Sequence, residues 1–156
     1  MRMSIVSVGK KHDSKIADAI ADYQKRASRY MPLEWRFVQI KHSTSVDNKA
    51  IRKQESLKIL RLLQPEDWVF LLDETGVAIT TPQLAQKIEN CKNSVAQNIV
   101  FIIGGAYGVD ETIIKRVDFN WSLSPLVFPH QLVRLLLTEQ IYRAHTILAG
   151  EKYHHQ

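Results

Sequence analysis

The chain has 156 residues, of which 45% are hydrophobic and 24% are charged. These values are typical of a globular protein, and the length suits one domain with a substantial core, so we expect a single domain over residues 1–156. No apolar run approaches the ~20 residues of a membrane-spanning helix. The single cysteine, Cys91, excludes an internal disulfide and a Cys-rich metal site. We therefore expect a cytoplasmic protein without a membrane partner.

The net charge of +5 is unevenly distributed along the chain. Residues 1–65 contain 14 Lys and Arg against 6 Asp and Glu, a balance of +8, whereas residues 66–156 contain 7 against 10, a balance of −3. A basic half favours a polyanionic partner such as RNA. A solvated lysine-rich surface explains the same excess equally well, so charge alone leaves both interpretations open.

Apolar residues alternate along the chain between the period of a strand and the period of a helix. The first half predicts a strand over 3–8, a helix over 13–28, a strand over 33–40, a polar loop over 41–50, a helix over 51–63, a strand over 68–72 and a turn over 73–76. The second half predicts a helix capped by Thr81, a strand over 99–103, a short helix from the cap Asp110 to 117, a strand over 121–123 and a helix over 129–149. This alternation, with two central strands apolar on both faces, is typical of an α/β protein whose mainly parallel sheet has helices on both faces.

A glycine-rich segment, Gly104–Gly108, follows a buried strand and precedes a helix. Ligands of open parallel sheets bind outside the carboxyl ends of the strands, and glycines let the main chain approach a ligand closely. The spacing matches neither the dinucleotide-binding fingerprint nor the phosphate-binding loop, and a tight turn explains the glycines equally well. Asp73 and Glu74 end the neighbouring strand, where they are either catalytic acids or, as we favour, turn caps.

The segment Leu123–His130 is apolar and contains two prolines. It suits a flat aromatic ring held by apolar walls and main-chain hydrogen bonds, although an ordinary buried connection is the alternative. In the helix that follows, Glu139 and Arg143 have the spacing of an ion pair, and Arg134 with Arg143 could bind phosphate; a plain salt bridge is favoured.

Leu132 and Leu135 widen the apolar face of the last helix, as burial against a second subunit would require. The tail Tyr153-His154-His155 offers a general base or, less readily, metal ligands. No catalytic triad, zinc-protease motif or pair of carboxylates stands out, so we expect a bound cofactor to supply the chemistry.

Five motifs in combination and order resemble the bacterial ribosomal RNA large subunit methyltransferase H family, whose members are knotted methyltransferases of the SPOUT class. The motifs are Gly104-Gly-Ala-Tyr-Gly108, Trp121-Ser-Leu-Ser124, Phe128-Pro-His-Gln-Leu-Val-Arg134, Glu139-Gln-Ile-Tyr-Arg-Ala144 and Tyr153-His154. The resemblance covers the whole chain, beginning at Ile5-Val-Ser-Val-Gly-Lys10. It implies a homodimer that uses S-adenosylmethionine, and no metal, to methylate N3 of a pseudouridine in 23S ribosomal RNA. It also implies a parallel sheet with a C-terminal trefoil knot.

The resemblance also implies roles for individual residues. The cofactor contacts that it implies are Leu72, Gly104, Leu123, Ser124, Pro125, Leu126, Val127 and Phe128. On the RNA side it implies His130, Arg134 and Tyr153. We hypothesise that His154 removes the N3 proton while Arg143 stabilises the negative charge, with solvent-mediated proton loss as the alternative. A non-catalytic RNA-binding or ribosome-associated module and a nucleotide-binding enzyme are the competing functions.

Overall fold

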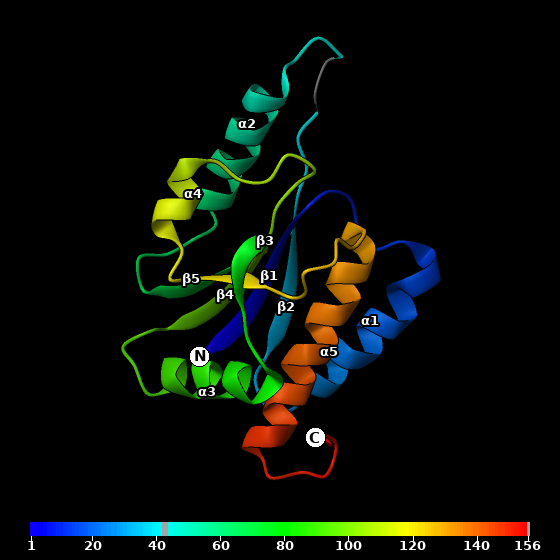
Figure 1. Cartoon of the computed structure of the whole chain (residues 1–156), viewed down its shortest axis with the longest axis vertical. Coiled ribbons are helices and arrows are strands. Elements are labelled where there is room, and N and C mark those ends of the chain that lie inside the picture. Colours follow the sequence, from blue (N-terminus) through cyan, green and yellow to red (C-terminus); the bar gives the residue numbers. More distant parts are fainter. Residues whose placement is uncertain (42–43, 156) are drawn as a thin grey trace.

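Parallel strands form the centre of the structure, a computed structural model that describes residues 1–41 and 44–155 (Figure 1). The strands are β1 (Arg2–Val8), β2 (Leu33–Val38), β3 (Asp67–Ala78), β4 (Asn98–Ile103) and β5 (Phe119–Ser122). They lie in the order β2-β1-β4-β3-β5, and every neighbouring pair is parallel. Their carboxyl ends therefore meet at one edge of the sheet, where ligands of such sheets bind.

Helices cover both faces of this sheet (Figure 1). One face packs against α1 (Ser14–Ala27), α3 (Thr81–Lys92) and α5 (His130–Leu148), and the other against α2 (Asn48–Leu60) and α4 (Glu111–Arg116). Successive residues of the central strands supply the two cores: Phe70 and Phe101 face the first, and Val69 and Val100 face the second. The α/β class with helices on both faces is confirmed, and the trefoil knot stays a prediction. In the described part of the chain, no helix is long and apolar enough to cross a membrane.

The predicted turn over 73–76 is wrong, because these residues continue strand β3. Pairing with β5 is interrupted between Leu72 and Val77 and then resumes. Within the interruption, the Asp73 carboxylate accepts a hydrogen bond from the Thr75 amide at 2.8 Å. The pairing with β5, which local sequence does not reveal, keeps the segment in the sheet.

Two helix starts also differ from the prediction. Thr80, and not Thr81, caps α3: its hydroxyl accepts a hydrogen bond from the Gln83 amide, while the Gln83 side chain accepts one from the Thr80 amide. Helix α2 begins at Asn48 because the Asp47 carboxylate accepts a hydrogen bond from the Ala50 amide at 2.6 Å. The end of the predicted loop over 41–50 is therefore helical, and residues 42 and 43 of it lie outside the described residues.

Candidate functional site

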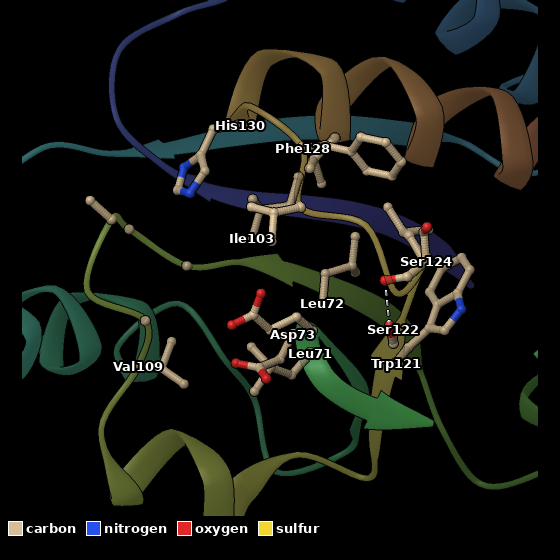
Figure 2. A pocket seen from close by; sticks show the side chains of 18 of the residues that line it. Leu71, Leu72, Asp73, Ile103, Val109, Trp121, Ser122, Ser124, Phe128 and His130 are labelled. Carbon is tan, nitrogen blue, oxygen red and sulfur yellow. Dashed lines mark hydrogen bonds between the residues drawn. The ribbon is translucent and has the colours of Figure 1, made fainter. Parts of the chain in front are cut away.

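A cavity of about 310 Å³ opens at the carboxyl ends of β3, β4 and β5 (Figure 2). Its volume falls at the small end of the range for small-molecule sites. Residues from four segments line it: Leu71, Leu72, Asp73 and Glu74; Ile103, Gly104, Gly105, Ala106, Gly108 and Val109; Trp121, Ser122, Leu123, Ser124, Leu126, Val127 and Phe128; His130 and Val133. The structure thus brings the glycine-rich segment and the apolar loop to one cavity.

The glycine-rich segment forms a tight turn at the cavity wall. The Gly108 amide donates a hydrogen bond to the Gly105 carbonyl at 3.0 Å, and Gly108 has a φ of +72°, which side chains rarely permit. A Cβ on Gly104 would come within 3.2 Å of Val109 Cγ1. The glycines therefore let the main chain line the cavity where a side chain would be crowded or strained.

The apolar loop forms the opposite wall and is held by hydrogen bonds of its own. The Ser122 hydroxyl donates to the Ser124 carbonyl, and the Ser124 hydroxyl accepts from the Leu126 amide, both at 3.0 Å. Leu126 and Val127 line the cavity but remain 69% and 79% exposed in the single chain. Pro125 is exposed and is not among the lining residues.

Charged and titratable groups lie at the edge of the cavity. Asp73 and Glu74 are among its lining residues. His130 lines it from the first turn of α5, and Figure 2 shows His130 and Asp73 at the cavity. Burial, and next the charge of Arg134, lower the pKa of His130, which favours the neutral imidazole. Apolar walls, close main-chain approach and two carboxylates fit S-adenosylmethionine, which combines an aromatic ring with a cationic sulfur and an ammonium group.

The tail folds back on α5 through polar and aromatic contacts. Arg143 donates to the Glu139 carboxylate from Nη2 at 2.6 Å and from Nε at 2.9 Å. The Tyr153 hydroxyl donates to the same carboxylate at 3.2 Å, and the Arg143 guanidinium lies 4.6 Å from the centre of the Tyr153 ring. The Tyr30 hydroxyl donates to Glu151 at 2.6 Å, which fixes the start of the tail. The predicted ion pair is therefore present, and it also holds Tyr153.

His154 lies in a second cavity, next to the first one. This cavity is lined by Ile79, Thr80, Thr81, Pro82, Trp121, Leu123, Gln140 and His154. Trp121 and Leu123 border both cavities and so stand between His154 and the first one. Within the described residues, both ring nitrogens of His154 are shielded from solvent and lack a hydrogen-bond partner.

The chain is similar to known proteins over almost its whole length. A model of the family described as "Predicted SPOUT methyltransferase" matches residues 1–154. Proteins named ribosomal RNA large subunit methyltransferase H are similar over nearly the whole chain. The one from Cytophaga hutchinsonii is 39% identical over 99% of this chain and 100% of its own, and the one from Geobacter metallireducens is 40% identical over 99% of each. The one from Acetivibrio thermocellus is 36% identical, again over 99% of each.

The chain belongs to the ribosomal RNA large subunit methyltransferase H family. It is therefore a methyltransferase of the SPOUT class, and the predicted family is confirmed. Of the residues expected to contact the cofactor, all except Pro125 line one cavity, although contact with a cofactor stays a prediction. Of those expected on the RNA side, His130 lines the same cavity, whereas Arg134 is 1% exposed and bonds within the protein.

The sequence does not predict that acidic residues form part of the cavity wall. The sequence favours Asp73 and Glu74 as turn caps, and the Asp73 carboxylate does accept a local hydrogen bond, yet both residues also line the cavity. Val109 also lines the cavity, which its local sequence does not predict. The position of Asp73 and Glu74 just after a buried strand was the available signal, because that end of a parallel strand faces the ligand.

Proposed function

We propose that this methyltransferase transfers a methyl group from S-adenosylmethionine to N3 of a pseudouridine in 23S ribosomal RNA, acting on the assembled ribosome in the cytoplasm. The proposal rests chiefly on one observation: the glycine-rich segment and the apolar loop line a single cavity at the carboxyl ends of the strands. The relatives named for methylation of large-subunit ribosomal RNA supply the substrate class.

S-adenosylmethionine, when bound, supplies a methyl group activated by a sulfonium sulfur. Leu72, Ile103 and Leu126 would give apolar contacts to the ligand, and Asp73 with Glu74 would balance its positive charge. The main chain at Gly104 approaches without a side chain in between. These residues hold the methyl donor in a fixed place, which is the main demand of a displacement reaction.

The acceptor nitrogen lies between two carbonyl groups and carries a proton that must leave. We assign removal of this proton to His154, whose ring nitrogens have no competing hydrogen bond in the described residues. We assign stabilisation of the negative charge to Arg143, whose pKa is raised chiefly by its hydrogen bond to Glu139, so that it stays charged. The rival is proton loss to solvent, with both residues only binding RNA.

A homodimer reconciles these assignments with the position of the tail. In one chain, Trp121 and Leu123 stand between His154 and the cofactor cavity. We propose that the tail of one protomer serves the acceptor side of the site together with the partner protomer. The exposed apolar residues Leu126, Val127 and Leu132 lie on the loop and helix that such a dimer would cover.

Calorimetric titration with S-adenosylmethionine tests the cofactor assignment. We expect binding of one ligand to the cavity, weakened by Leu126→Asp, which places a charge among its apolar lining residues. Val95→Asp, at a 95% exposed position outside that cavity, is the matched control and should bind normally. A chain with no affinity for S-adenosylmethionine would instead be a non-catalytic RNA-binding module.

Methylation of ribosomes from a strain that lacks the activity tests the substrate. Assembled ribosomes, isolated large subunits and free 23S RNA are incubated with the protein and S-adenosylmethionine, and the nucleosides are analysed by mass spectrometry. We expect N3-methylpseudouridine with assembled ribosomes. A methyl group on another nucleoside, or no transfer to any of the three, would refute the proposed function.

A further inference from the structure

Among the described residues, Arg134 is a buried cation without a carboxylate partner. It is 1% exposed, and its guanidinium donates to the Ser7 hydroxyl at 3.0 Å, the Lys10 carbonyl at 2.8 Å and the Val8 carbonyl at 3.3 Å. All three acceptors are neutral, and no ion pair among the described residues includes Arg134. Burial lowers its pKa accordingly. Burying a charge without a counter-charge costs free energy. We therefore interpret the guanidinium as a group that holds in place the segment to which it donates hydrogen bonds.

That segment, the β1–α1 loop (residues 9–13), is fixed by further contacts. The Asp13 amide donates to the Gln131 side chain of α5 at 2.9 Å. The His12 ring meets the rings of Trp35 and Phe37 edge-on, with centroids 4.4 and 5.2 Å apart. Gly9 has a φ of +113°, and a Cβ there would come within 3.3 Å of Arg134 Nη2. The loop is therefore fixed along its length.

The same loop carries two exposed lysines, Lys10 and Lys11. Neither ammonium takes part in an ion pair of the described part of the chain. The loop follows β1 directly, and the end of β1 pairs with Ile103, which lines the cavity. It also lies against the first turns of α5, from which His130 lines the cavity (Figures 1 and 2).

We propose that Lys10 and Lys11 bind phosphates of the substrate RNA at the mouth of the cavity, and that Arg134 is the positioning residue that holds them there. The inference rests on the proposed function and names the part of the chain that would grip the RNA. Lysines bind phosphate as point charges, and a fixed loop loses little conformational freedom on binding. The buried charge of Arg134 adds to the positive potential of the two lysines.

The double variant Lys10→Ala/Lys11→Ala tests the phosphate contacts. Its matched control, Lys25→Ala/Lys115→Ala, also removes two exposed lysines, from α1 and α4, and neither lines the cavity. We expect the double variant to raise KM for ribosomes about tenfold, with kcat and the S-adenosylmethionine Kd nearly unchanged. The plot of log(1/KM) against log salt should become shallower by about 0.7 to 0.9 for each lost contact.

An unchanged KM and salt slope, an equal change in the control, or loss of S-adenosylmethionine binding would each overturn the phosphate assignment. Failure of the proposed function is a separate result, because the wild-type chain would then methylate none of the three ribosomal substrates.

Arg134→Lys tests the positioning role while keeping the positive charge. A lysine cannot bridge the three acceptors, so we expect a higher KM for ribosomes with an unchanged S-adenosylmethionine Kd, and faster proteolysis within residues 9–13. Ser7→Ala, which removes one acceptor, should produce the same pattern more weakly and covers the case in which Arg134→Lys fails to fold. A wild-type KM in a folded Arg134→Lys or Ser7→Ala variant would contradict the role.

Discussion

The carboxylate of Glu55 occupies the space that a side chain on residue 105 would need. A Cβ on Gly105 would come within 3.1 Å of the Glu55 carboxyl carbon and closer still to one of its oxygens. The next residue of α2, Ser56, accepts a hydrogen bond from the Asp110 amide at 2.9 Å. Helix α2, on the face of the sheet opposite α5, therefore supports the glycine-rich segment that lines the cavity.

Gly105→Ala should weaken S-adenosylmethionine binding and lower the free energy of unfolding by only about 1 kcal/mol, because the added methyl group displaces the end of the buried Glu55 side chain and not the main chain. Urea denaturation and calorimetric titration measure the two effects. Glu55→Ala in the same chain makes room for the methyl group, so the double variant should be less destabilised than the sum of the single variants. Strict additivity would show that the overlap is not what makes glycine necessary at this position.

His154→Ala and Arg143→Ala should each lower kcat about 100-fold or more without changing the S-adenosylmethionine Kd, because neither residue lines the cofactor cavity. Single-turnover methylation of ribosomes gives the rate. His155→Ala is the matched control, since His155 is exposed and its neighbour His154 is not. Full turnover in both variants, with normal cofactor binding, would leave proton loss to solvent as the mechanism.

The chain should form a homodimer through its exposed apolar loop and the start of α5. Val127 is 79% exposed and Leu132 is 38% exposed in the single chain, which favours burial against another surface. We expect the mass of a dimer by light scattering, and that of a monomer after Val127→Asp/Leu132→Asp. Val95→Asp, at a 95% exposed position in another region, should remain dimeric. A monomeric wild-type chain with full activity would contradict this prediction.

Stability should fall as the pH drops from about 6.5 towards 4. His145 is 1% exposed, and burial, followed by the charge of Lys92, lowers its pKa to about 4. The unfolded chain, whose histidine keeps a pKa near 6.5, binds the proton more tightly than the folded chain does. The contribution of neutral His145 to the free energy of unfolding is therefore complete above pH 6.5. It is lost on acidification, which lowers the free energy of unfolding by up to roughly 3 kcal/mol.

Urea denaturation at pH 7.5 and pH 5 measures this pH dependence. His145→Gln should show a smaller loss of stability between the two pH values, whereas the exposed-site variant His155→Gln should match the wild type. Some pH dependence of stability should remain in both variants, because the pKa values of His12 and His130 are also lowered by burial and by the charge of Arg134. Equal slopes in wild type and His145→Gln would exclude His145 as the source.

The sequence alone determined the α/β class and the family. Apolar periodicity is a local property, so the alternation of strands and helices was visible without any long-range information. The order of the motifs from Gly104 to His154 was sufficient for the family, which the comparisons confirm. The family resemblance and the general rule for parallel sheets also predicted that segments 104–108 and 123–128 meet in one cavity.

Only the tertiary structure decided which polar groups are buried and against what. Arg134, expected to face RNA, is enclosed because β1 and its loop supply acceptors from more than 120 residues away. Glu55 lies under Gly105 because α2 packs on the opposite face of the sheet, and β3 continues past Leu72 because β5 pairs with it. Each outcome depends on contacts between segments that are distant in the sequence. The periodicity of one segment does not identify the segment that packs against it.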